Sequence, residues 1–177
     1  ADSRLFLGEI DFREDIRILD LGTGGGFPGI VIAIHHPEAE LLLVDSIQKK
    51  INVVSDVVKR LNLTNVTAIC SRAEELAIKK SPPYQGGDLG LPAEASAQAG
   101  EVRHFQKYFD YIVSRSVAVL QDLCVWSKDL IKPGGKLITV KGGDIAGEIH
   151  KTRKLNYIKN VKTTIEGERK IVTVDFN

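Results

Sequence analysis

A glycine-rich run near the start of the chain contains the residues best placed to do chemistry. An apolar stretch ends in Asp20, and glycine then occupies every second position, at Gly22, Gly24 and Gly26. Glycine adopts positive φ angles and allows the backbone to come into contact with a bound group. The pattern is typical of a buried strand that turns sharply over a nucleotide-sized ligand, although glycine-rich turns also occur without any ligand.

The spacing of these glycines narrows the kind of ligand. A dinucleotide-binding loop needs a third glycine three positions after the second, and Phe27 stands there instead. The alternating glycines after an acidic residue resemble the cofactor loop of Rossmann-like methyltransferases, which bind S-adenosylmethionine. Pro28 and Gly29 then open an apolar stretch that reads as a helix, since proline is tolerated in the first turn.

Alternating strand and helix patterns must position this loop. We expect a parallel sheet with helices on both faces, because strand–helix units repeat along the chain. The expected class is α/β, and a mostly parallel sheet that ends in an antiparallel hairpin resembles the Rossmann-like class I S-adenosylmethionine-dependent methyltransferase fold. The expected strands are residues 16–21, 41–44, 66–70, 109–114 and 136–141, the helices are 30–36, 51–61, 71–79, 119–131 and 145–155, and the hairpin is 157–164 with 170–176.

Two further sites follow the second and third expected strands. Asp45 ends the second strand, where an acidic residue can accept both ribose hydroxyls of a cofactor. The alternative for Asp45 is capping of the helix that follows it. Ala73 and Glu74 follow the third strand, where the adenine would lie, and Glu74 also completes a capping-box pattern with Ser71. Both roles of Glu74 are compatible.

Length and composition describe an ordinary globular chain. The 177 residues, 43% hydrophobic and 27% charged, predict one domain over residues 1–177 without a membrane span. Cys70 and Cys124 lie in apolar segments, which favours reduced cysteines and a cytoplasmic protein. The histidines and cysteines show no metal-ligand spacing, so no metal is expected. The chain starts at Ala1 and contains no methionine, so an N-terminal segment is expected to be missing.

Residues 81–104 interrupt the pattern and are expected to form a surface loop insertion. The loop begins with Ser81-Pro82-Pro83-Tyr84, which resembles a motif of methyltransferases that act on exocyclic amino groups. That motif belongs directly after the fourth strand, and here it precedes it. We interpret the tetrapeptide as a stiff loop start.

Five segments together resemble the GidB family, bacterial guanine-N7 methyltransferases of small-subunit ribosomal RNA. Their order and spacing cover most of residues 16 to 144, and a helical segment precedes this region in the family. The segments are residues 20–30, 44–46 with Lys49 and Lys50, 71–76, 113–118, and 132–135 with 140–142. The Gly-Gly-Gly-Phe-Pro-Gly and Ser-Arg-x-Val-Ala runs are far more specific than a generic cofactor loop.

The resemblance implies roles for particular residues. It implies cofactor contacts at Gly22, Phe27, Ala73, Glu74 and Arg115, beside those expected at Gly24, Gly26 and Asp45. It also implies that Arg115 and Lys141 face the RNA. The alternative for Arg115 is a surface ion pair, and for Lys141 a solvated strand end.

The implied reaction needs no catalytic acid or base. N7 of guanine carries a lone pair and no proton, so in-line placement of donor and acceptor suffices. We therefore name no catalytic residue, with Arg115 as a positioning candidate. Two alternatives stay open: a methyltransferase for a small molecule or protein, and a module that binds cofactor or RNA without turnover.

The basic residues gather near the C-terminus. The whole chain has a net charge of +1, yet residues 151–170 carry seven basic and two acidic side chains, a local net charge of +5. Such a patch, with Lys151, Arg153 and Lys154 at its start, is a candidate phosphate footprint on ribosomal RNA or the small ribosomal subunit. A solvated helix and hairpin face would look the same. We expect a monomer.

Overall fold

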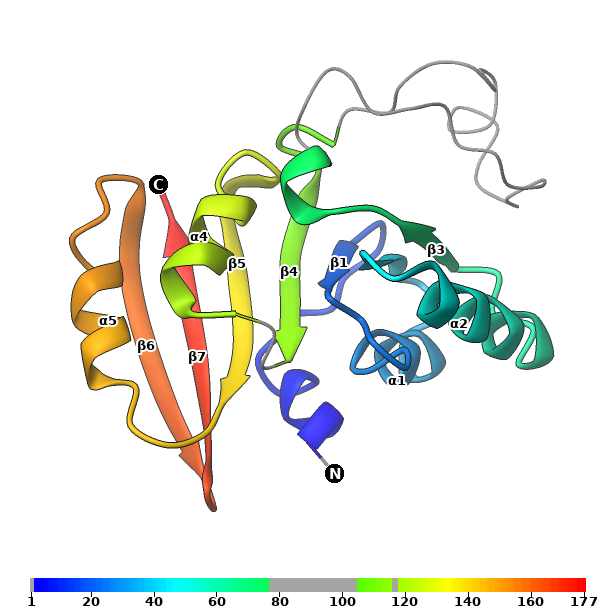
Figure 1. The fold of residues 1–177 in the computed structure, drawn as a ribbon, viewed down its shortest axis with the longest axis horizontal. Helices are drawn as coiled ribbons and strands as arrows, with labels where there is room; N and C mark the ends of the chain where they lie inside the picture. Colours follow the sequence, from blue (N-terminus) through cyan, green and yellow to red (C-terminus); the bar gives the residue numbers. More distant parts are fainter. Residues whose placement is uncertain (1, 77–104, 116–117) are drawn as a thin grey trace.

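A seven-stranded sheet forms the centre of the computed structural model, which describes residues 2–76, 105–115 and 118–177. The strand order is β3-β2-β1-β4-β5-β7-β6. The first five strands of this order are parallel, and β7 runs antiparallel to both β5 and β6. Figure 1 shows the sheet with the chain's C-terminal hairpin at the opposite end from β3. The predicted α/β class and the terminal antiparallel hairpin are confirmed.

The elements alternate as the hydrophobic pattern predicts. The strands are β1 (Arg17–Leu21), β2 (Glu40–Asp45), β3 (Val66–Cys70), β4 (Phe109–Arg115), β5 (Ile131–Lys141), β6 (Ile158–Glu166) and β7 (Arg169–Phe176). The helices are α1 (Gly29–His35), α2 (Gln48–Arg60), α4 (Leu120–Ser127) and α5 (Ala146–Thr152), with short 3₁₀ turns η1 (Asp2–Phe6) and η2 (Ala73–Glu75). The turn η1 was not predicted from the sequence.

Two hydrophobic cores lie on the two faces of the sheet. On one face, Ile18 of β1 packs with α1, α2 and η1, and Phe6 of η1 is fully buried there. On the other face, Leu19 and Leu21 pack with α4 and α5. Successive side chains of a strand point to opposite faces, and after Arg17 the residues of β1 are apolar on both faces except at Asp20. This parity places the Asp20 side chain on the same face as α1.

Two predicted boundaries are wrong between residues 119 and 136. The helix predicted to reach Ile131 ends at Ser127, and β5 begins at Ile131 rather than Lys136. The backbone N–H groups of Lys107 and Tyr108 donate to the carbonyls of residues 129 and 130. These residues therefore pair with the segment before β4 instead of continuing the helix. Residues 133–135 form an irregularity within β5. Their Pro-Gly-Gly sequence is typical of a turn, so the sequence predicts a strand that begins only after them.

The site is positioned where the strand order reverses. From β1 the chain proceeds to β2 and β3 on one side, and returns to β4 on the other side of β1. In open α/β sheets, ligands bind beyond the carboxyl ends of the strands at this reversal. The glycine loop follows β1 directly, and Arg115 ends β4, so both lie at the reversal.

Candidate cofactor and substrate site

The glycine loop has the backbone conformation that its sequence predicts. Gly22, Gly24 and Gly26 have φ angles of 74°, 61° and 94°. The N–H groups of Gly22 and Thr23 both donate to the Val44 carbonyl, at 2.8 and 2.9 Å, which ties the loop to the end of β2. A Cβ built on Gly24 would have only the Gly22 carbonyl oxygen near it, at 4.0 Å. The loop therefore leaves open space above Gly24.

Other glycines of the run are required by packing. A Cβ on Gly26 would lie 2.3 Å from the Cδ1 atom of Ile30, and one on Gly29 would lie 2.8 Å from an Asp20 carboxylate oxygen. Both glycines are buried and let α1 approach β1 and β2 closely. Internal packing is thus sufficient to explain Gly26, and the cofactor contact expected there stays a prediction.

Asp20 is a carboxylate enclosed beneath the loop. Its side chain is 0% exposed, and Oδ2 accepts hydrogen bonds from Thr23 Oγ1 and the Gly29 N–H, both at 2.8 Å. Oδ1 is buried and has no hydrogen-bond partner. Burial raises the pKa of Asp20 to about 6, against the opposing effects of these two hydrogen bonds and of the Arg115 charge. A cation bound nearby would stabilise the ionised form.

Asp45 has the local contacts of its alternative role. Its Oδ1 accepts a hydrogen bond from the Ile47 N–H at 3.0 Å, just before α2. Its Oδ2 accepts from the Gly24 N–H at 3.0 Å and from Lys50 Nζ at 3.1 Å. The carboxylate therefore joins the glycine loop to the start of α2. An ionised carboxylate oxygen can accept two hydrogen bonds, and Oδ1 accepts one here, so ribose binding is compatible with these contacts and stays a prediction.

The end of β3 brings the expected adenine region to the same edge. The Ser71 N–H donates to the Asp45 carbonyl at 3.2 Å, and Ala73 and Glu74 follow in η2. The predicted capping box is displaced by one residue, because Glu75, not Glu74, accepts the hydrogen bond from the Arg72 N–H. Glu74 is exposed. Of the helix predicted over residues 71–79, the described residues contain the 3₁₀ turn η2, and residues 77–79 lie outside the described residues.

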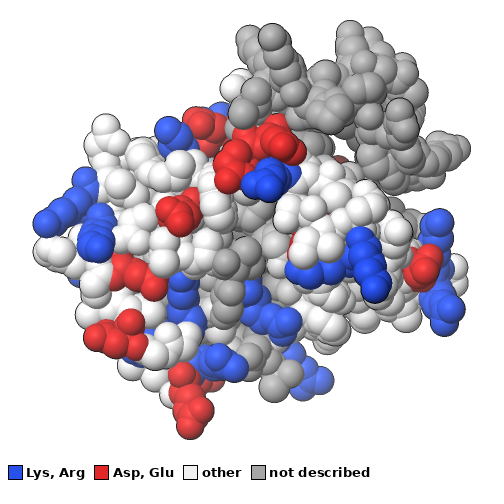
Figure 2. All heavy atoms as spheres, in the orientation of Figure 1, with Lys and Arg blue, Asp and Glu red and all other residues white. Residues whose placement is uncertain are grey.

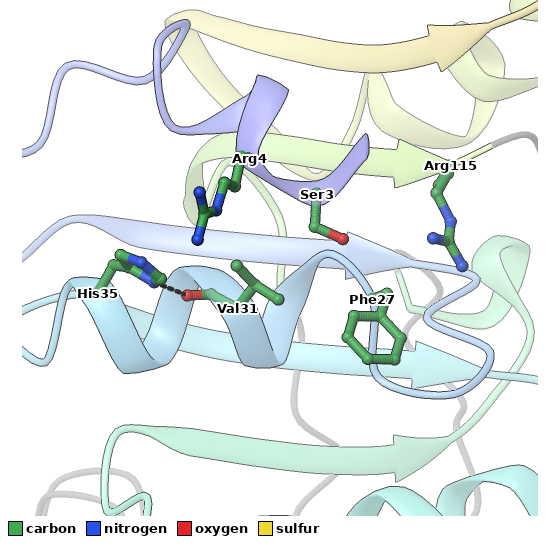
Figure 3. A pocket seen from close by; sticks show the side chains of 6 residues that line it. All are labelled: Ser3, Arg4, Phe27, Val31, His35 and Arg115. Carbon is green, nitrogen blue, oxygen red and sulfur yellow. Dashed lines mark hydrogen bonds between the residues drawn. The ribbon is translucent and has the colours of Figure 1, made fainter. Parts of the chain in front are cut away.

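Arg115 and Phe27 meet on the other side of the loop. The Arg115 guanidinium carbon lies 5.7 Å from the centre of the Phe27 ring, and the Phe27 side chain is 42% exposed. Both border a cavity of ≈ 420 Å³, which is also lined by Ser3, Arg4, Val31 and His35. Figure 3 shows the cavity between η1 and α1, with Arg115 and Phe27 at one end and Arg4 and His35 at the other.

Lys141 is occupied within the protein. Its residue is 8% exposed, and its Nζ donates to the Ala118 carbonyl and, at 2.9 Å, to Glu148 Oε2. The same Glu148 oxygen accepts the Leu120 N–H at 2.7 Å. Although burial opposes it, these hydrogen bonds lower the pKa of Glu148. This arrangement joins β5, α4 and α5 and does not favour an RNA contact at Lys141, which stays a prediction.

The C-terminal basic residues lie away from the glycine loop. Lys151, Arg153 and Lys154 stand in or just after α5, which packs near β6 at the end of the sheet. Arg153 Nη2 donates to the Val161 carbonyl at 3.0 Å. On the face drawn in Figure 2, basic side chains also gather around the carboxyl ends of β4 and β5, beside η1. An RNA-binding role for the C-terminal basic residues stays a prediction.

Several expectations concern parts or ligands that the structure does not describe. The loop at 81–104 and its Pro-Pro-Tyr motif lie outside the described residues. Within the described ranges, no three histidine, cysteine or acidic side chains are arranged to hold a metal ion. The helices among those same residues include none that is long and apolar enough to cross a membrane.

Sequence reasoning missed one side of the site. Arg4, Val31 and His35 carry no motif, Asp2-Ser3 resembles only a dipeptide that precedes the first strand in the GidB family, and the contact of these residues with the cavity arises only when η1 packs on α1. The sequence identifies Asp20 as the acidic residue after an apolar stretch, but its unpartnered oxygen follows only from its burial.

Comparison with known families gives a consistent result. A family model described as "GidB: rRNA small subunit methyltransferase G" matches residues 1–86 and 92–172. A protein named ribosomal RNA small subunit methyltransferase G from Chlorobium phaeobacteroides is 38% identical over 79% of this chain and 50% of its own length. The protein of that name from Chlorobaculum tepidum is 41% identical over 78% of this chain and 51% of its own. The chain thus spans about half the length of these relatives.

Solved structures show the same fold. A SAM-dependent methyltransferase from Aquifex aeolicus has a TM-score of 0.66 at 18% identity, over 99% of this chain and 90% of its own. An rRNA methylase from Streptococcus thermophilus has a TM-score of 0.62 at 14% identity, over 99% of this chain and 94% of its own. At these identities the likeness concerns the fold alone.

Proposed function

We propose that this chain, which belongs to the GidB family of rRNA small subunit methyltransferase G proteins, transfers a methyl group to N7 of a guanine in small-subunit ribosomal RNA. The methyl donor is S-adenosylmethionine. The observation that carries the proposal is the meeting of the glycine loop, Asp45 and Arg115 at the reversal of strand order. A cofactor and a base can lie against each other there.

The residues present fit the cofactor. The Asp20 carboxylate is enclosed beneath the loop, so its negative charge would attract the cationic groups of the cofactor from below without contacting them. The open space above Gly24 suits a flat or extended group lying on the loop. Asp45 would hold the ribose, and Ala73 and Glu74 would border the adenine. When bound, the cofactor supplies a methyl group activated by its sulfonium.

The chain's own residues would then position the base. N7 of guanine attacks without losing a proton, so the site needs placement more than a general base. Arg115 and Phe27, exposed beside the loop, would hold the base or its phosphate close to the methyl group. Positive charge passes from sulfur to the guanine ring during transfer. A cation near the base would therefore serve binding rather than stabilise that charge.

A methylation assay tests this function. Small subunits and deproteinised RNA from a strain lacking the gene are incubated with the protein and cofactor labelled in its methyl group. We expect label at guanine N7, detected by chemical cleavage of the RNA at the methylated base. Label on protein, on a small molecule or on another base atom would contradict the proposal and favour a methyltransferase of another substrate class.

The remaining expectations are part of the same proposal. We propose that residues 1–177 act as one methyltransferase domain, that the protein is a monomer, and that it works in the cytoplasm, where ribosomal RNA is present. Ultracentrifugation of the purified protein would test the monomer, and fractionation of cells would test the compartment.

A further inference from the structure

The cavity between η1 and α1 shares Phe27 and Arg115 with the expected cofactor contacts and extends beyond them to Arg4 and His35, which have no role in the proposed function. We propose that it holds one nucleotide of the RNA substrate beside the methylated guanine, with Arg4 binding the phosphate of that nucleotide. The inference rests on the proposed function and adds to it an RNA-binding residue, Arg4, outside the glycine loop.

The size and shape of the cavity suit a single nucleotide. Its ≈ 420 Å³ lies within the range of roughly 300–1,000 Å³ that is usual for small-ligand sites. Figure 3 shows the Ser3 side chain on the wall between the two arginines, with its oxygen directed toward Arg115. The His35 ring is held at the far end by a hydrogen bond of 2.8 Å between Nδ1 and the Val31 carbonyl. The cavity is thus an open hollow with a mainly apolar lining and with polar side chains at its two ends.

The charge at both ends favours an anion. Arg4 and Arg115 are exposed, and among the described residues no carboxylate lies within 4.0 Å of either guanidinium. A pair of arginines without acidic partners attracts phosphate, which a guanidinium binds through two parallel hydrogen bonds. A negatively charged chain passing from Arg115 to Arg4 would meet a cation at each end.

The surfaces between the arginines favour a nucleotide over a bare anion. The exposed ring of Phe27 offers a face on which a base can stack, and Val31 adds an apolar wall. Bases of single-stranded RNA stack on aromatic rings and on arginine planes in this way. Paired bases of an RNA helix are already stacked, so the geometry points to an unpaired segment.

The far end of the cavity, at Arg4 and His35, lies away from the expected ribose and adenine contacts. The expected ribose and adenine contacts, Asp45 and Glu74, follow β2 and β3, on one side of the glycine loop. The cavity opens from Phe27 and Arg115 on the other side and extends along α1 toward His35. A nucleotide in it would be a neighbour of the base that receives the methyl group.

Removal of the Arg4 charge tests the phosphate contact. The variant Arg4→Gln is compared with wild type and with Arg60→Gln, which removes an exposed arginine at the far end of α2. Affinity for a fluorescent single-stranded RNA containing guanine is measured at several salt concentrations. We expect Arg4→Gln alone to weaken binding about threefold to tenfold and to reduce the slope of log Kd against log salt by about 0.7, the value for one phosphate on a single strand.

Filling the cavity tests its occupation without changing charge. The variant Val31→Phe places a larger side chain in the cavity, whereas Ile34→Phe places one on the exposed side of the same helix, where Ile34 is 50% exposed. We expect Val31→Phe to weaken RNA binding and to leave the affinity for S-adenosylmethionine at the wild-type value. Ile34→Phe is expected to leave both affinities unchanged.

Three outcomes would overturn the inference. These are unchanged RNA affinity and salt slope in Arg4→Gln, equal effects of Val31→Phe and Ile34→Phe, and weaker binding of free guanosine monophosphate without weaker binding of RNA. If wild-type protein methylates ribosomal RNA and the variants behave like it, the inference alone fails. If wild-type protein neither binds nor methylates the RNA, the proposed function fails.

Discussion

At the scale of single residues, Asp20 is the most unusual group in the structure. It is the next-to-last residue of β1, on the face covered by α1, and it is fully buried among apolar neighbours. Its Oδ2 fixes the glycine loop through Thr23 and the start of α1 through Gly29. Its Oδ1 has no hydrogen-bond partner, so the residue costs stability when ionised. This destabilising group lies beneath the proposed cofactor site.

Asp20→Asn is expected to change the pH dependence of stability. Burial raises the folded-state pKa of Asp20 from 3.8 to about 6. The wild-type protein therefore loses stability as pH rises from about 4 to about 6, and this contribution then stays constant at higher pH. A shift of this size corresponds to on the order of 3 kcal/mol. The free energy of unfolding of Asp20→Asn should therefore rise relative to that of wild type between pH 4 and 7. Urea unfolding at a series of pH values measures it, and a difference that does not vary with pH would contradict the assignment.

Gly24 offers a second test at this scale, with a matched control. Gly24 and Gly167 have φ angles of 61° and 59°, and an added Cβ would clash at neither position. Alanine at either site therefore costs similar backbone strain, about 1 kcal/mol. We expect Gly24→Ala to weaken S-adenosylmethionine binding at least tenfold in calorimetry, since the methyl group occupies the space above the loop. Gly167→Ala, in the turn between β6 and β7, should bind like wild type, and equal affinities in the two variants would remove the loop from the site.

At the scale of elements, one ion pair holds three of them together. Lys141 at the end of β5 pairs with Glu148 of α5, and Glu148 also accepts the first N–H of α4. The α4 helix follows the segment after Arg115, so this contact holds the chain shortly beyond that residue. Lys141, expected to face RNA, thus has a structural role in the described contacts.

Glu148→Ala is expected to destabilise the protein by about 2–4 kcal/mol, because it leaves the Lys141 side chain, 10% exposed, without its ion-pair partner. Because hydrogen bonds to Glu148 lower its pKa against the effect of burial, this stabilisation is present near neutral pH and is lost as pH falls through that pKa. Chemical unfolding measures the effect, with the exposed Glu168→Ala as control. A loss no larger than that of the control would show that the pair contributes little.

At the scale of the whole molecule, Asp110 connects segments that are distant in sequence. Its Oδ1 accepts from Arg13 at 3.0 Å, and its Oδ2 accepts from the Arg17 N–H at 3.0 Å and from Lys132 Nζ at 2.8 Å. From the second position of β4, it thereby joins the segment before β1, the start of β1 and the start of β5. Burial acts to raise the pKa of Asp110, but the hydrogen bonds from Lys132, Arg17 and Arg13 outweigh it and hold the pKa low.

Asp110→Asn is expected to lower the free energy of unfolding by about 1–3 kcal/mol at pH 7, because a buried carboxylate with three donors is replaced by a neutral amide. The lowered folded-state pKa means that the wild-type advantage is present above pH 4 and disappears as pH falls through that pKa. Unfolding curves at pH 7 and at pH 2.5 to 3 measure this. An advantage that persists unchanged in acid would contradict the ionic origin of the effect.

The sequence by itself determined the elements and the cofactor loop. Apolar runs such as 41–44 are long enough and uniform enough to be strands buried on both faces, and the structure has β2 there. The glycines at 22, 24 and 26 required positive φ, and all three have it. These features depend on local backbone preferences and on hydrophobic periodicity, both of which are written in adjacent residues.

Only the tertiary structure decided which side chains are available at the site. The sequence suggests that Lys141 is a free cation at the end of a strand, yet its ammonium group forms an ion pair with Glu148, seven residues later. Arg4 carries no motif, yet the packing of η1 on α1 brings it to the same cavity as Arg115. The long-range pairing of residues 129–131 with 107–109 likewise ended α4 early. Contacts between distant segments depend on how the cores close around the sheet, and no local pattern encodes them.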